Sequence, residues 1–118
     1  MNSATAKHSN VLSCRLPRIR NRKGRCYELA AMGCFVPGPG WVLVHGEVNG
    51  PPPTVGRIGH AWLELDGLVY DPVLDQAIGQ DVYTAKFSAI PVTRYTSVEA
   101  ANQIATRGHY GPWCGKTS

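Results

Sequence analysis

The segment that most constrains the fold is "HAWLELDGLVYDP", residues 60–72. It holds two runs of β-forming side chains on either side of Asp66 and Gly67. An Asp-Gly pair between such runs is the strongest short-range signal for a hairpin with a two-residue turn. In that hairpin Leu65 pairs with Leu68, and every other pair follows by counting outward from the turn. The sequence therefore predicts an antiparallel hairpin of defined register.

This register places two polar side chains on one face of the hairpin. Trp62 falls opposite Asp71, and His60 shares the face of Trp62 because alternate strand residues point the same way. His60 and Asp71 are then diagonal neighbours, about 7–8 Å apart between backbones. A carboxylate in that position can fix the tautomer of an imidazole and support its protonated form. The alternative is a half-buried strand histidine and an aspartate that only ends a strand before Pro72.

The chain predicts one helix before the strands and one after them. Residues 26–35 carry small and apolar side chains at helical spacing, and the "PGPG" that follows ends the helix. Residues 97–107 form the second predicted helix, with Thr96 and Glu99 as a capping box at its start. Gly108 is placed to stop it.

Residues 41–48 and 89–96 are rich in β-forming side chains and predict two further strands. Residues 73–87 have no clear pattern, and residues 109–118 predict no element. A helix, several antiparallel strands and a second helix make an α+β fold. At 118 residues, the chain has the length of one domain.

The first 27 residues contain seven lysines and arginines and no acidic residue, so their charge is +7. The rest of the chain carries −3. We therefore expect a basic arm at residues 1–22, followed by a single domain at residues 23–118. Such an arm can bind nucleic acid or an acidic protein. The alternatives are a solvated leader without a partner, or a transit peptide, although no clear amphipathic helix is present.

No run approaches the roughly 18 apolar residues of a membrane helix, and no apolar secretory signal is visible. We therefore expect a soluble, cytoplasmic protein with no membrane partner. The cytosol keeps thiols reduced, so we expect Cys14, Cys26, Cys34 and Cys114 as thiols. Two disulfides are the alternative if the protein is exported. No C-x-x-C pair is present, which gives a structural zinc site little support.

Cys26 begins the first predicted helix, after Gly24 and Arg25. A helix amino terminus favours an anion, and a protonated histidine nearby also favours the reactive thiolate of a cysteine. If this helix packs on the hairpin so that Cys26 meets His60, the chain has a nucleophile, a base and an orienting carboxylate.

Three segments carry a family resemblance: "G-x-C-x-E-x-A" at 24–30, "H-A-W-x-E" at 60–64 and "D-P" at 71–72. In this order they resemble the transglutaminase-like branch of the papain-like cysteine peptidase and amidase superfamily, which has short members among bacterial and phage proteins. The resemblance implies a papain-like α+β core, with a Cys-bearing N-terminal helix on an antiparallel sheet and a C-terminal helix. The catalytic residues that it implies are Cys26, His60 and Asp71.

The resemblance also implies thiol chemistry on an amide. His60 takes the proton of Cys26, a thioester forms, and water or an amine resolves it. Water makes a peptidase or amidase, and an amine makes a transglutaminase. The chain is much shorter than a protein-crosslinking transglutaminase, so we expect hydrolysis of a peptide or protein amide, with no cofactor.

Other side chains are candidates for supporting roles. The oxyanion is expected to bind the backbone N–H of Cys26 and a second donor, for which Asn21 is a candidate. Trp62 either contacts substrate and shields the catalytic pair, or fills the core. Glu64 is expected to be exposed near the turn. If a neighbouring strand brings His45 to the site, a zinc set is an alternative, although its spacing fits no compact zinc motif.

Two functions of different classes therefore follow. The first is a cysteine hydrolase acting through Cys26, His60 and Asp71. The second is a catalytically idle module of the same fold that binds nucleic acid or an acidic protein through residues 1–22.

Overall fold

The computed structural model describes residues 24–36, 40–50 and 56–113, and these form an α+β fold. Its elements in chain order are α2 (Cys26–Cys34), β1 (Val42–Asn49), β2 (Arg57–Leu65), β3 (Leu68–Asp71), β4 (Gln76–Gly79), α3 (Gln80–Phe87), β5 (Ile90–Tyr95) and α4 (Ser97–Arg107). The α+β class expected from the sequence is confirmed. The predicted arm, with Asn21, and the thiols Cys14 and Cys114 lie outside the described residues.

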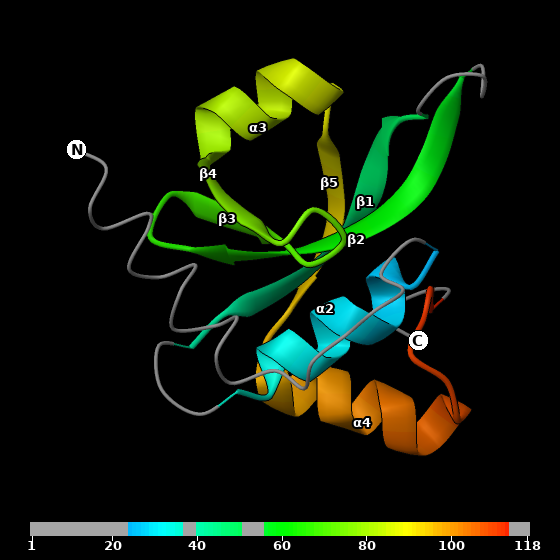
Figure 1. Ribbon diagram of the computed structural model, residues 1–118. Coiled ribbons are helices and arrows are strands. Elements are labelled where there is room, and N and C mark those ends of the chain that lie inside the picture. The colour runs from blue at the N-terminus through cyan, green and yellow to red at the C-terminus, as the bar shows by residue number, and fades with distance from the viewer. Residues whose placement is uncertain (1–23, 37–39, 51–55, 114–118) are drawn as a thin grey trace.

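The strands form one antiparallel sheet in the order β4-β3-β2-β1-β5. Helices α2 and α4 lie on one face of this sheet, and α3 lies on the other (Figure 1). Each face has its own apolar core, because strand side chains alternate between the two faces. The α2 and α4 face buries Leu43, Ala61, Leu63 and Tyr95, and the α3 face buries Val44, Trp62, Val69 and Tyr83.

The predicted hairpin is confirmed with its register. Leu65 pairs with Leu68, and the next pairs outward are those counted from the sequence. Asp66 and Gly67 both have positive φ, 51° and 79°, as a two-residue turn of type I′ requires. The ladder ends at the pair formed by Leu63 and Tyr70, so the predicted pairing of Trp62 with Asp71 is not part of it.

The end signals of α4 are also confirmed, whereas residues 37–39 of the "PGPG" expected to end the first helix lie outside the described residues. The Thr96 side chain accepts from the Glu99 N–H, and the Glu99 side chain accepts from the Thr96 N–H, which completes the capping box of α4. Gly108 follows the helix with φ 77°, the left-handed conformation that stops it. Helix α2 occupies most of its predicted range.

Residues 73–87, whose sequence pattern is ambiguous, contain β4 and α3. Tyr83 is the only buried residue of α3, and Val82 is 59% exposed. A helix that buries one side chain has no apolar stripe, so periodicity could not reveal it. Among the described residues, no helix is long and apolar enough to cross a membrane.

Candidate active site

Cys26 is the first residue of α2 and a free thiol. Arg25 precedes it at the N-cap without capping the helix through its side chain, which instead binds the Glu28 carboxylate at 3.0 and 3.1 Å. The helical ladder begins with the bond from the Leu29 N–H to the Arg25 carbonyl. The backbone N–H groups of the first turn, including that of Cys26, therefore point out of the helix end without an intrahelical acceptor. Such a helix end favours an anion.

The His60–Asp71 pair predicted from the sequence is present. The Nε2 atom of His60 lies 2.8 Å from Oδ2 of Asp71, and the two side chains are 14% and 3% exposed. The other carboxylate oxygen, Oδ1, accepts from the backbone N–H groups of Val73 at 3.0 Å and Leu74 at 3.4 Å. The turn after β3 thus holds the carboxylate in place toward His60.

Tyr83 is a site residue that the sequence analysis missed. Its hydroxyl donates to Oδ2 of Asp71 over 2.6 Å, the same oxygen that binds His60. Its ring lies between Trp62, at 5.5 Å between centroids, and Phe87, at 4.9 Å. The one available signal was the spacing of Tyr83 and Phe87, which places two aromatic rings on one side of a helix.

The protonation of this cluster follows from its contacts. Burial lowers the pKa of His60, but the hydrogen bonds and charges of Asp71 and Cys26 outweigh it, and the pKa rises to about 9. Burial raises the pKa of the Asp71 carboxyl, but hydrogen bonds with His60, Tyr83 and the Leu74 N–H hold it below its usual value. At neutral pH the pair is therefore an imidazolium and a carboxylate.

Cys26 is a hydrogen-bond partner of His60, at the part of β2 that β3 does not cover. Strand β3 pairs with β2 only along Leu63–Leu65, so the part of β2 before Leu63 extends beyond the end of β3. The amino end of α2 lies against this part, since a Cβ on Gly59 would be 2.7 Å from the hydroxyl of Tyr27. Because Nε2 of His60 is bound to Asp71, Nδ1 is the nitrogen that remains for the thiol. The predicted packing of the cysteine-bearing helix against the hairpin is present.

Trp62 lies behind the histidine and is 1% exposed. Its ring is 6.1 Å from that of His60 between centroids, and its Nε1 donates to Glu64 at 3.3 Å. This position suits a packing role, and a direct substrate contact would need surface that Trp62 lacks. The expectation that Glu64 is exposed is wrong: its side chain is 14% exposed and binds Arg94 at 2.9 Å, because β5, on the far side of β1, brings a cation to it.

His45 does not join the site. Its partner across β1 and β2 is Ala61, so it points to the face opposite His60. It is 6% exposed and packs among aromatic rings with centroids 4.8–5.1 Å away, those of Tyr27, Tyr95 and Trp113. The alternative zinc set with His45 is therefore wrong in its geometry. In the described part of the chain, no group of three or more His, Cys, Asp and Glu side chains could hold a metal.

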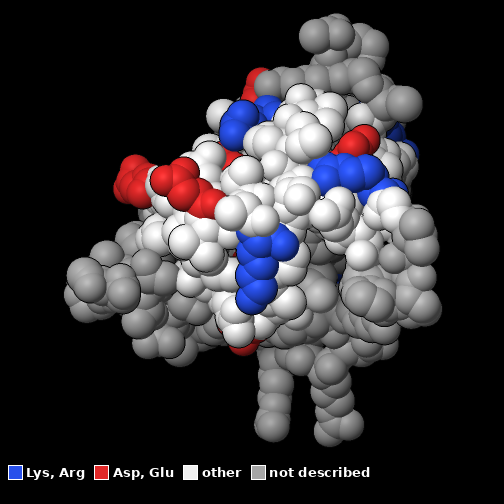
Figure 2. Space-filling model, turned by 90° about the horizontal axis from the view of Figure 1, so that it is seen from above, with Lys and Arg blue, Asp and Glu red and all other residues white. Residues whose placement is uncertain are grey.

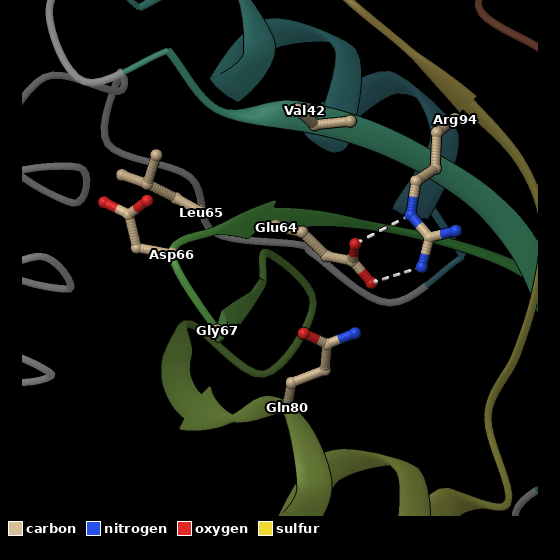
Figure 3. A pocket seen from close by; sticks show the side chains of 7 residues that line it. All are labelled: Val42, Glu64, Leu65, Asp66, Gly67, Gln80 and Arg94. Carbon is tan, nitrogen blue, oxygen red and sulfur yellow. Dashed lines mark hydrogen bonds and ion pairs between the residues drawn. The ribbon is translucent and has the colours of Figure 1, made fainter.

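A groove of about 260 Å³ lies elsewhere on the α3 face (Figure 3). Glu64 and Arg94 point toward each other across it, and Gln80 of α3 and the hairpin turn line another side (Figure 3). Neither Cys26 nor His60 is among its lining residues. The groove is therefore not the opening through which a substrate would reach the thiol.

Comparison of the chain with protein-family models, with curated proteins and with solved structures found no match. The chemistry of the site is therefore what bears on the function.

Proposed function

We propose that this protein is a thiol-dependent hydrolase, a cysteine peptidase or amidase of the transglutaminase-like, papain-like type that its motifs resemble. The observation that carries the proposal is the connected set Cys26, His60 and Asp71, in which Nε2 of His60 lies 2.8 Å from Asp71. A nucleophile, its base and a group that orients the base are the minimum for nucleophilic acyl transfer.

In the proposed reaction, Nδ1 of His60 already holds the proton of Cys26, and the thiolate attacks the carbonyl carbon of an amide. The tetrahedral intermediate collapses as His60 gives its proton to the leaving amine, which leaves a thioester on Cys26. His60 then takes a proton from a water molecule, whose oxygen attacks the thioester carbonyl. The C–S bond breaks, the acid leaves, and the pair of Cys26 thiolate and His60 imidazolium is restored. Throughout, Asp71 holds the ring and stabilises its protonated form.

The backbone N–H of Cys26, at the start of α2, supports a site for the oxyanion. We propose Asn21 as the second donor. We also propose a peptide or protein amide as substrate, because an amide needs both the thiolate and a proton for its leaving amine. The thiolate, base and donors supply this chemistry from side chains and backbone, so the proposal includes no cofactor. We propose the cytoplasm as its location, because its reducing conditions keep a thiol nucleophile free.

The test is the rate at which iodoacetamide alkylates Cys26 as a function of pH, with the adducts located by mass spectrometry. We expect fast alkylation of Cys26 at pH 7, and its loss in His60→Ala. Cys34 is an internal control, because it is 3% exposed and burial raises its pKa to about 11. It should react slowly in both proteins.

Slow alkylation of Cys26 at pH 7 that His60→Ala leaves unchanged would overturn the proposal. The matching activity assay screens peptide and acyl-anilide libraries with the full chain. Release of amine should be lost in Cys26→Ser and retained in Cys34→Ser. Amine release that persists in Cys26→Ser would assign the activity to another group.

The basic arm supports a second candidate, the idle binding module, on the charge of +7 in the first 27 residues. The described surface above α3 has acidic and basic side chains interspersed, with no large basic patch (Figure 2). Binding of nucleic acid or an acidic protein would therefore depend on residues 1–22 and weaken steeply with salt. If deleting residues 1–22 abolishes binding while Cys26→Ala has no effect on function, binding is the main role.

A further inference from the structure

The Asp71 carboxylate has more hydrogen bonds than orientation requires. The N–H groups of Val73 and Leu74 already hold Oδ1, and His60 binds Oδ2. The hydroxyl of Tyr83 is a further donor, 2.6 Å from the same Oδ2. Because the backbone fixes the carboxylate from its other oxygen, loss of the Tyr83 hydroxyl would leave the geometry of the Asp71–His60 pair in place.

Tyr83 is also held firmly as a neutral donor. It is 1% exposed, and its ring packs between Trp62 and Phe87. Burial and the adjacent Asp71 charge raise the pKa of its hydroxyl well above the usual value. Tyr83 therefore keeps its proton over the whole pH range in which a thiol and an imidazole exchange theirs.

Two donors on one carboxylate oxygen compete for its electron density. A hydrogen bond from Tyr83 stabilises the Asp71 anion and makes Oδ2 a weaker partner for the His60 imidazolium. This matters to the proposed hydrolysis, because His60 must release its proton to the leaving amine. An imidazolium bound too strongly by Asp71 would hold that proton.

We propose that Tyr83 is a positioning residue that limits how strongly Asp71 binds the His60 imidazolium, so that His60 can return its proton to the leaving group. The catalytic purpose rests on the proposed hydrolase function, whereas the effect on His60 does not. The titratable groups that act on this ring and carboxylate come from every element around them: Cys26 of α2, His60 of β2, Asp71 of β3 and Tyr83 of α3.

The first experiment is an NMR titration of the His60 ring in the full chain, in the wild type and in Tyr83→Phe. The phenyl ring keeps the packing against Trp62 and Phe87 and removes only the hydroxyl. We expect the pKa of His60 to rise by about half a pH unit or more, since Oδ2 is left to His60 alone.

The matched control is Tyr70→Phe. Tyr70 is also fully buried and donates to a carboxylate, that of Asp75, but it packs in the core on the α2 and α4 face. We expect Tyr70→Phe to leave the pKa of His60 within about 0.2 pH units of the wild type. A fall in that pKa in Tyr83→Phe, or a value equal to that of Tyr70→Phe, would show that Tyr83 only packs.

Kinetic measurements distinguish an effect of Tyr83 on proton return by His60 from a role in packing alone. In Tyr83→Phe, alkylation of Cys26 at pH 7 should be undiminished while amide hydrolysis falls roughly 3- to 10-fold, because proton return is slower. A residue that only supports the fold would lower both rates together, and that result would also overturn the inference.

Should Tyr83→Phe not fold, 3-fluorotyrosine placed at position 83 by nonsense suppression gives the opposite test. Its hydroxyl is a stronger donor, so the pKa of His60 should fall, and an unchanged value would overturn the inference. The titration needs no activity. Inert Cys26 with a shifted His60 would reject the hydrolase proposal alone, and an active enzyme with an unshifted His60 would reject the role of Tyr83 alone.

Discussion

His45 on β1 and His60 on β2 are neighbours in the sheet, since Gly46 pairs with His60, yet they lie on opposite faces. Both are largely buried, and burial lowers the pKa of each. For His45 nothing offsets burial, because neither ring nitrogen has a hydrogen-bond partner among the described residues, and its pKa falls to about 4. For His60, Asp71 and Cys26 outweigh burial, and its pKa rises to about 9. Hydrogen-bond and charge partners, and not the degree of burial, decide which histidine carries charge.

The largest expected effect on this difference between the two histidines comes from removing the carboxylate charge of Asp71 beside His60. Asp71→Asn should bring the pKa of His60 down toward that of a buried histidine without a partner, and lower amide hydrolysis by about 10³- to 10⁴-fold. NMR titration and steady-state kinetics measure the two effects. Asp75→Asn is the control: its carboxylate also accepts from a buried tyrosine but does not touch His60. Equal losses in both variants would show that the turn, and not the charge, matters.

The second prediction concerns His45 and acid. Its pKa is about 4 when folded against about 6.5 when unfolded, so below pH 6.5 the unfolded chain binds more protons. The folded state should therefore lose on the order of 2–3 kcal/mol as the pH falls from about 6.5 to about 4. Urea unfolding at pH 7 and pH 4.5 measures this, and His45→Phe should reduce the difference by that amount. An undiminished acid sensitivity in His45→Phe would place the cause elsewhere.

His60 should show the opposite sign. Its pKa is about 9 when folded and 6.5 when unfolded, so the folded state binds the proton more tightly. This contribution is complete below about pH 6.5 and is lost as the pH rises through about 9, by about 2–3 kcal/mol at most. In His60→Gln, unfolding free energies at pH 7 and pH 9.5 should lie closer together than in the wild type. A wider gap would contradict the assigned direction.

The smallest expected effect is at Tyr27, which lies close both to His45 and to the segment that carries His60. Its ring lies 4.9 Å from His45, and its hydroxyl lies over Gly59, next to His60. In Gly59→Ala the new Cβ would meet that hydroxyl at 2.7 Å, so Tyr27 must shift and carry the start of α2 with it. We expect hydrolysis to fall roughly tenfold with about 1 kcal/mol of stability lost.

Gly79→Ala is the matched control for this substitution. Gly79 has φ −55°, and a Cβ there meets nothing within 4 Å. Its activity should equal that of the wild type. If both glycine variants behave alike, the packing of Tyr27 on Gly59 does not set the position of Cys26.

Local signals accounted for the parts of the site that lie within one short segment. The Asp66-Gly67 turn determines the hairpin register, so it placed His60 and Asp71 together with no knowledge of the rest of the fold. The alternation of β2 likewise put Trp62 and Glu64 on the same face as His60. The exposure of Glu64 could not be foreseen, since it depends on Arg94, 30 residues away.

The sequence by itself thus determined the hairpin, the capped α4 and a cysteine at a helix start, because turns, caps and alternation depend on neighbouring residues. Only the tertiary structure decided that Tyr83 shares the Asp71 carboxylate, that α2 reaches β2 beyond the end of β3, and that His45 finds no polar partner within the described part of the chain. These contacts join elements that no local pattern relates. The protonation of each histidine therefore depends on packing across the whole sheet.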